Sequence, residues 1–182
     1  MFKKALDFLL DVTQTITVSL SIFVVIYLFL GRPTQVLGYS MEPSLGNNDR
    51  LLVESVSYRM GEPKRGDIVV VSRPVVENID YVKRVIGVSG DNLIIKDCRV
   101  FLKNGDHQEA LSENYLIPNT CTKGGSKIIE GEIIQIPSNF YLVMGDNREH
   151  SFDGRFFGLL PKSAIASRAI VRYWPMGKRK IF

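Results

Sequence analysis

The sequence predicts a mainly β protein: a coiled antiparallel, barrel-like sheet preceded by one N-terminal transmembrane helix. Two observations carry this prediction. The run 12–30 contains no charged residue, whereas the rest of the chain consists of short apolar runs separated by Gly, Pro, Asn and Asp. That second part has few helix signals and no βαβ spacing, a pattern typical of all-β domains. We therefore expect an anchor at 12–30 and one β-rich domain at 31–182.

The apolar run 12–30 is long enough for one membrane crossing, which takes about 17–25 helical residues. Its Thr and Ser hydroxyls can bond to the carbonyls of the helix itself. Lys3 and Lys4 precede the run, and this bias places residues 1–11 in the cytoplasm and the domain outside the plasma membrane. A cleaved secretory signal is the alternative, but the run is longer than a usual signal core and no small-x-small site follows at 31–33.

The expected strands of the domain are bounded by turn-forming residues. Asn104-Gly105 predicts a two-residue hairpin turn. The less regular segment 104–131 is expected to be a hairpin or an insert rather than a second domain, and a short helical turn is expected at 161–166. The expected strands are 34–38, 50–54, 67–71, 81–88, 92–96, 99–103, 132–136, 140–144 and 168–174.

Charge and composition exclude some functions. The net charge is +4, and the basic residues are spread out rather than gathered in the aromatic-interleaved stripe of nucleic-acid binders. A mildly basic surface suits anionic lipid. The two cysteines and two histidines show no zinc-ligand spacing, so we expect no metal or cofactor. Cys98 and Cys121 form either a disulfide on the oxidising side of a membrane or two free thiols, and the sequence leaves both open.

Ser40 and Lys83 form a candidate catalytic pair. Ser40 follows the apolar run closely, and a serine hydroxyl needs a base to become a nucleophile. Alternation along 81–86 places Lys83 and Arg84 on opposite faces of a strand, so one of the two must face an apolar side. Burial lowers the pKa of a lysine, and a neutral amine can act as a general base. From periodicity alone, a lysine that extends to water is equally consistent.

Four segments resemble the successive motifs of bacterial type I signal peptidases (leader peptidases). Their combination is specific, and the resemblance covers the anchor and nearly all of the domain. It implies a membrane-bound serine endopeptidase that removes signal peptides from exported preproteins with a Ser/Lys dyad. The segments are SMEPS at 40–44, GDIVV at 66–70, YVKRVIG at 81–87 and GDNREHSFD at 145–153.

The resemblance assigns a role to each matching residue. Ser40 is the nucleophile and Lys83 is the general base. Five further residues form a supporting shell: Ser151, which hydrogen-bonds and orients the lysine amine, the ion pair of Asp146 and Arg84, and the ion pair of Asp153 and Arg155. Solvated surface pairs are the alternative for these four charges.

We expect the substrate to bind as an extended segment that pairs with the backbone near 36–38 and 81–83. By resemblance, shallow pockets select Ala-x-Ala before the cut. The oxyanion hole is expected from the Ser40 amide, because Gly38 has no side-chain donor. The expected substrate-binding residues are Val36, Gly38, Met41, Leu45, Tyr81 and Val82.

Three other functions compete with this interpretation. A Ser-His-Asp triad would use His150, which lies close in sequence to two aspartates; His107, beside the hairpin turn, is expected to be solvated. A self-cleaving repressor protease shares the serine–lysine chemistry but needs a DNA-binding helix-turn-helix. The non-enzymatic alternative is a membrane-tethered β-domain that only binds a partner.

Overall fold

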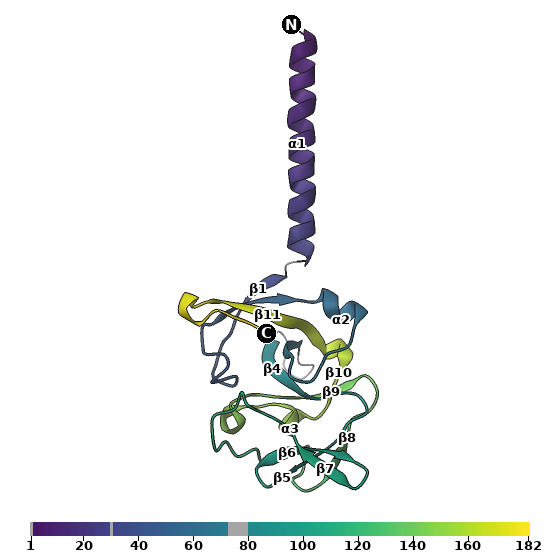
Figure 1. Cartoon of the computed structure of the whole chain (residues 1–182), viewed down its shortest axis with the longest axis vertical. Helices are drawn as coiled ribbons and strands as arrows, with labels where there is room; N and C mark the ends of the chain where they lie inside the picture. Colours follow the sequence, from purple (N-terminus) through teal and green to yellow (C-terminus); the bar gives the residue numbers. More distant parts are fainter. Residues whose placement is uncertain (1, 30, 73–79) are drawn as a thin grey trace.

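The computed structural model describes residues 2–29, 31–72 and 80–182 and consists of a long helix and a β-rich domain (Figure 1). Helix α1 spans Phe2–Phe29, and its stretch Lys3–Val24 is long and apolar enough to cross a membrane by length and composition. The helix includes residues 2–11 as well as residues 12–29 of the predicted span. The boundary between these two segments stays a prediction, and residue 30 lies outside the described residues.

Four hydroxyl groups of α1 are satisfied within the helix. The hydroxyls of Thr13, Thr15, Thr17 and Ser21 each donate to the carbonyl oxygen four residues earlier, at 2.8 Å. A hydroxyl that is bonded in this way does not need water as a partner. These four side chains are therefore compatible with a membrane span, as the sequence predicted.

A bend at Gly31 connects α1 to the first strand, β1 (Arg32–Gln35). Gly31 has φ +86°, a conformation that favours glycine. A Cβ at this position would also collide with the carbonyl of Val53. The chain thus turns from the helix directly into the edge of the sheet (Figure 1).

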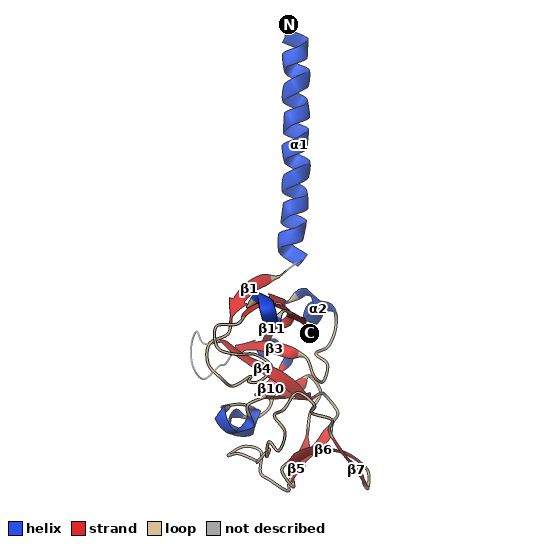
Figure 2. Cartoon of the chain, turned by 60° about the vertical axis from the view of Figure 1, so that its left-hand side comes forward, coloured by secondary structure: helices blue, strands red, loops and turns tan. Residues whose placement is uncertain are grey.

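The domain contains two antiparallel sheets, which Figure 2 shows in red. The larger sheet has the order β1-β2-β11-β3-β4-β9-β10, with β12 paired to β11, and the smaller has the order β7-β6-β5-β8. The mainly β, coiled antiparallel fold is confirmed. The strands of the larger sheet after β1 are β2 (Arg50–Glu54), β3 (Ile68–Ser72), β4 (Asp80–Gly87), β9 (Phe140–Met144), β10 (Leu160–Pro161), β11 (Ile165–Trp174) and β12 (Lys180–Ile181). Those of the smaller sheet are β5 (Asn92–Lys96), β6 (Arg99–Asn104), β7 (His107–Ala110) and β8 (Ile133–Gln135).

Several predicted boundaries differ from the structure. The first predicted strand, 34–38, is displaced toward the helix as β1, so residues 36–38 lie beyond it. The predicted helical turn at 161–166 is the shorter helix η2 (Lys162–Ala164), because β11 already begins at Ile165. The predicted hairpin exists, but Asn104 pairs with His107, so its two-residue turn is Gly105-Asp106 rather than Asn104-Gly105. The short helices, which the sequence did not predict, are α2 (Val56–Met60), α3 (Gly154–Phe157), η1 (Arg148–His150) and η3 (Met176–Lys178).

Buried apolar side chains form three clusters, and β3 and β4 contribute to more than one of them. Val70 and Val82 pack in one cluster, whereas Val69 and Val85 pack in another. The central strands are therefore covered on both faces. This explains why both Lys83 and Arg84 are buried, where alternation alone required burial of only one.

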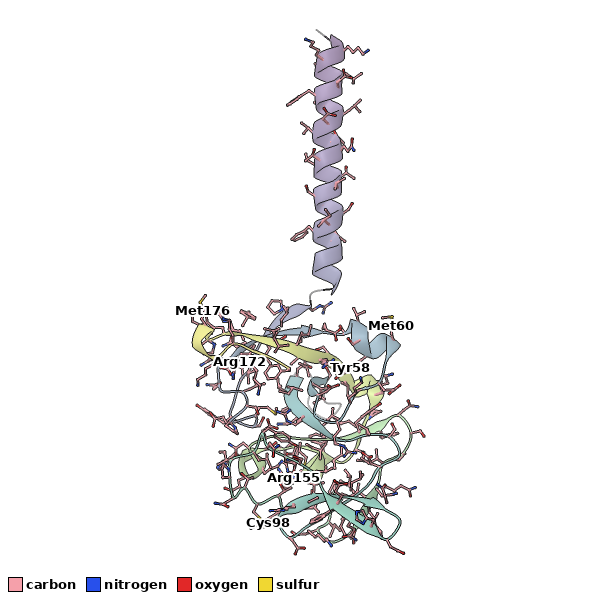
Figure 3. The ribbon with its side chains drawn as sticks, viewed as in Figure 1. Tyr58, Met60, Cys98, Arg155, Arg172 and Met176 are labelled. Carbon is pink, nitrogen blue, oxygen red and sulfur yellow. A yellow bond between two sulfur atoms is a disulfide. The ribbon has the colours of Figure 1, made fainter. Side chains whose placement is uncertain are left out.

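Cys98 and Cys121 form a disulfide with a Cα–Cα distance of 4.3 Å. Of the two states that the sequence left open, the structure has the bridge rather than free thiols. The bridge ties the turn between β5 and β6 to the middle of the insert 104–131. Cys98 lies at the end of the domain that is farthest from α1 (Figure 3).

Candidate active site

Ser40 lies in a tight turn that follows β1. The Glu42 amide donates to the Tyr39 carbonyl at 3.2 Å, and the Leu45 amide donates to the Met41 carbonyl at 2.8 Å. Met41 and Leu45 are buried in an apolar cluster and fix the turn to the sheet. Ser40 itself is only half-buried, so its hydroxyl is held by a rigid turn but remains accessible.

Lys83, on β4, reaches this hydroxyl from the interior of the domain. Its side chain is almost wholly buried at 1% exposure, and Nζ donates to Ser40 Oγ at 2.8 Å. Burial lowers the pKa of Lys83 to about 8, and the charge of Asp153 opposes this shift in part. At neutral pH roughly a tenth of the amines are then uncharged, far more than for an ordinary lysine. A neutral amine beside a serine hydroxyl can accept its proton.

The loop 145–153 packs directly against the nucleophile. The Asn147 amide donates to the Ser40 carbonyl at 3.0 Å, and the Asn147 side chain donates to the Tyr39 carbonyl at 3.2 Å. A Cβ at Gly145 would collide with both the Ser40 carbonyl oxygen and the Ser151 side chain. Glycine is therefore required where the loop meets Ser40.

Arg84 and Asp146 form a buried bidentate ion pair behind the site, as predicted from the motifs. Arg84 Nε donates to Asp146 Oδ1 at 2.8 Å, and Nη2 donates to Oδ2 at 2.6 Å. Arg84 also donates to the Gly66 carbonyl at 2.8 Å and to Ser44 Oγ at 3.2 Å. Bidentate geometry of this kind fixes orientation as well as charge. The pair thus connects β4 to the loop 145–153 and to the turn of Ser40.

Asp153 and Arg155 form the second predicted pair, also buried and bidentate. Arg155 Nε and Nη2 donate to the two Asp153 oxygens at 2.9 Å each. The Gly145 amide donates to Asp153 Oδ2 at 3.0 Å. Burial alone would raise the pKa of Asp153, but the Arg155 guanidinium holds the pKa below its usual range. The carboxylate therefore stays charged and holds Gly145 in place.

Ser151 lies at the site but does not make the predicted hydrogen bond to Lys83. Its hydroxyl is buried and has no hydrogen-bond partner among the described residues. The side chain packs against Gly145, while the hydrogen bond of Lys83 Nζ goes to Ser40. A supporting role for Ser151 stays a prediction.

Sequence reasoning missed a third ion pair, between Arg148 and Glu113. The Arg148 side chain is completely buried, and it also donates to Thr122 and to the Gly145 carbonyl. Arg148 stands within the motif 145–153, but nothing in its spacing indicated a partner in the irregular insert 104–131. Only the packing of that insert against the loop shows the pair.

The expected substrate-binding residues surround the dyad at different depths. Tyr81 and Val82 are half-buried on β4, and Gly38 is exposed with φ +94°. Three of them are core residues in the free protein: Val36, Met41 and Leu45. Their contribution to substrate pockets stays a prediction.

The edge of β4 beside Ser40 is open among the described residues. The pairing of β4 with β9 begins at Arg84, whereas Tyr81, Val82 and Lys83 pair only with β3 on their other side. Unpaired backbone groups at a strand edge can accept a further extended segment. The backbone of 81–83 therefore has no partner strand on this side among the described residues.

The two histidines are both exposed. His150 ends the short helix η1, and His107 lies in the β6–β7 hairpin. The hydrogen bond that Ser40 Oγ accepts comes from Lys83. The structure thus gives Ser40 a lysine as its neighbouring base.

Comparison with known proteins gives one consistent result. The family model described as "Signal peptidase, peptidase S26" matches residues 9–174. "Probable signal peptidase I-2" of Synechocystis sp. is 33% identical over 92% of this chain and 74% of that protein. "Signal peptidase IB" of Staphylococcus aureus strain Mu50 is 34% identical over 94% of this chain and 93% of that protein. A crystal structure of a signal peptidase I from Enterococcus faecalis overlaps 59% of this chain and 96% of that chain, with a TM-score of 0.46 and 22% identity.

Proposed function

The chain belongs to the signal peptidase family, peptidase S26, and we propose that Ser40 and Lys83 are the nucleophile and the general base with which it cleaves. It is a serine peptidase that removes signal peptides from preproteins. The observation that carries the assignment is the 2.8 Å contact between Lys83 Nζ and Ser40 Oγ, made by a lysine that is 1% exposed. A non-catalytic binding module gives no reason for such a contact.

The first chemical step transfers a proton within this pair. Uncharged Lys83 accepts the Ser40 proton while Oγ attacks the scissile carbonyl, and the resulting ammonium then donates a proton to the departing amine. Water hydrolyses the acyl-enzyme with the same lysine as base. Because the pKa of Lys83 is lowered to about 8, the uncharged form is populated near neutral pH.

The developing oxyanion requires hydrogen-bond donors close to Ser40. No described residue accepts a hydrogen bond from the Ser40 amide, and this N–H is therefore available as a donor. Gly38 lies two residues earlier, and a Cβ there would meet no atom of the described residues within 4 Å. We propose that the substrate strand occupies this space and pairs with 81–83. Gly38→Val should then slow cleavage both by steric conflict and because a side chain is strained at the φ of +94° that Gly38 adopts.

The remaining proposals concern the membrane. The apolar helix α1 anchors the enzyme in the plasma membrane, with residues 1–11 in the cytoplasm and the domain 31–182 outside. The Lys3 and Lys4 bias supports this orientation. The test is to add protease to the outside of sealed, right-side-out vesicles. Removal of the domain 31–182 is the expected result, and removal of only a short N-terminal segment would contradict the proposed orientation.

Cleavage of a preprotein by the detergent-solubilised protein tests the catalytic assignment. Ser40→Ala should yield no mature product, and Ser163→Ala, a serine exposed on η2, should cleave as the parent chain does. Mature product from the Ser40 variant at the parental rate would refute the assignment. Circular dichroism of both variants establishes that the fold is retained.

A further inference from the structure

The segment 111–122, which we term the strap, is a closed loop of the insert. Its ends are fixed near one place, because the Leu111 amide donates to the Val100 carbonyl at 2.8 Å and the Thr122 amide donates to the Cys98 carbonyl at 2.9 Å. The disulfide of Cys98 and Cys121 closes the same end covalently. Compact loops with tied ends hold their side chains in fixed positions.

The strap supplies three partners of Arg148: Glu113, Thr122 and, at 3.5 Å, the Tyr115 hydroxyl. The Glu113 carboxylate forms the ion pair with the Arg148 guanidinium, and the Thr122 hydroxyl accepts a further hydrogen bond from it. A completely buried guanidinium is stable only when its charge and donors are satisfied. Arg148 therefore depends on the strap for its position.

Arg148 passes this position on to the catalytic loop. Its Nε donates to the Gly145 carbonyl at 3.0 Å. The Gly145 amide in turn donates to Asp153 Oδ2, and a Cβ at Gly145 would collide with both the Ser151 side chain and the Ser40 carbonyl oxygen. A short series of contacts thus leads from the strap to the residue that carries the nucleophile.

A second contact leads from the same carboxylate to the other arginine. The Tyr115 hydroxyl donates to Glu113 Oε1 at 2.7 Å, and the Tyr115 ring lies 4.0 Å from the Arg84 guanidinium carbon. Arg84 belongs to the ion pair with Asp146. The Tyr115 hydroxyl also accepts a hydrogen bond from Arg148 Nη2 at 3.5 Å, so Tyr115 contacts both arginines behind the site. Glu113 binds Arg148 directly and is linked to Arg84 through Tyr115.

We propose that Glu113 is a positioning residue for signal-peptide cleavage: it holds Arg148, and through Gly145 it fixes Ser40 relative to Lys83. The proposal rests on the proposed catalytic function of Ser40 and Lys83. Glu113 does not touch the reacting atoms, and the open edge of β4 at 81–83 is not part of the strap. Its loss should therefore lower kcat and leave KM unchanged.

Steady-state cleavage by the full-length solubilised protein tests this proposal. Glu113→Gln removes the charge with little change in size, and we expect kcat to fall by about 10-fold to 100-fold, as for small displacements of catalytic groups. KM should stay within about 2-fold. Glu113→Asp keeps the carboxylate and should recover part of the loss. Glu130→Gln, an exposed glutamate of the same insert, is the matched control and should match the parent chain.

Parental kcat in folded Glu113→Gln, or a rise in KM at constant kcat, would overturn the proposal. If Glu113→Gln does not fold, Thr122→Val decides. This substitution keeps the side-chain shape and removes only the hydroxyl, and parental kcat in that variant would equally overturn the proposal. Ser40→Ala measured in parallel separates the two hypotheses: its activity tests the dyad, whereas the Glu113 and Thr122 variants test the strap.

Discussion

Lys83 and Arg84 are neighbours on β4, yet their surroundings differ: those of Arg84 stabilise a positive charge, and those of Lys83 disfavour one. Arg84 has a bidentate carboxylate, a backbone carbonyl and an aromatic ring around it. Lys83 has a neutral serine hydroxyl at hydrogen-bond distance and the Tyr81 ring at 5.7 Å, but no carboxylate is paired with it among the described residues, and its side chain is almost wholly buried. One face of the strand stabilises a permanent charge, and the other disfavours a charge so that it can be given up. Both side chains are buried, but Arg84 is held as a charged member of an ion pair, whereas Lys83 is suited to act as a base.

A permanent charge on the Lys83 side of β4 should have the largest effect on cleavage. Lys83→Arg cannot release a proton in the physiological range, so we expect cleavage to fall by at least about 1000-fold, as when one member of a catalytic unit is lost. Single-turnover cleavage of a preprotein measures this. Measurable activity at the parental pH dependence would show that Lys83 is not the base.

Removing the partner of Arg84 should affect stability. Asp146→Asn leaves a buried guanidinium without its carboxylate, and we expect the free energy of unfolding to fall by about 3–5 kcal/mol. Urea titration followed by circular dichroism gives the value. Asp106→Asn in the exposed β6–β7 turn is the control, expected within about 0.5 kcal/mol of the parent. An equally small change for Asp146→Asn would show that the pair is dispensable for folding.

Lys83→Met should raise the free energy of unfolding at pH 7, whereas Asp146→Asn should lower it. The folded protein lowers the pKa of Lys83 from 10.5 to about 8, so below pH 8 the buried ammonium destabilises the fold by up to about 3 kcal/mol. That penalty disappears as the pH rises from 8 to 10.5, because the unfolded chain then also loses its proton. Lys83→Met should therefore be inactive but more stable than the parent at pH 7, with no advantage above pH 10.5. A less stable variant at pH 7 would contradict this account.

The pH dependence of cleavage distinguishes the two basic residues with the smallest expected effect, and it requires no substitution. Only uncharged Lys83 acts as base, so kcat/KM should rise about tenfold per pH unit below pH 8 and level off above it. Arg84 does not titrate in this range. A profile measured from pH 6 to pH 9.5 with a short peptide substrate suffices, and a flat profile for the chemical step would count against Lys83.

The contact between Ser40 and Lys83 could be predicted because the sequence motifs contain residues that lie together in the folded domain. Ser40 and Lys83 are 43 positions apart and form a hydrogen bond, and both predicted ion pairs exist. The alternation argument was less complete. It indicated burial of only one of the two basic residues of β4. Periodicity alone does not show that apolar clusters cover both faces of the strand.

What the sequence could not predict depends on irregular segments. Glu113, Tyr115 and Thr122 lie in a stretch without periodicity, so nothing indicated that they reach the catalytic loop. The disulfide was left open because sequence spacing does not give the Cα separation. The hydrogen bond expected between Ser151 and Lys83 is absent because side-chain orientation within a loop depends on packing against Gly145, which a motif does not encode.

The connection between helix α1 and the domain is short. Helix α1 ends at Phe29 and β1 begins at Arg32, so with the helix in a bilayer two residues separate the first strand of the domain from the membrane-spanning helix. A preprotein that is still embedded by its own signal sequence diffuses in the same plane. Their meeting is then a search in two dimensions, in which confinement raises the effective concentration of the cleavage segment. A higher effective concentration lowers the affinity that the open edge of β4 would need in order to bind the cleavage segment.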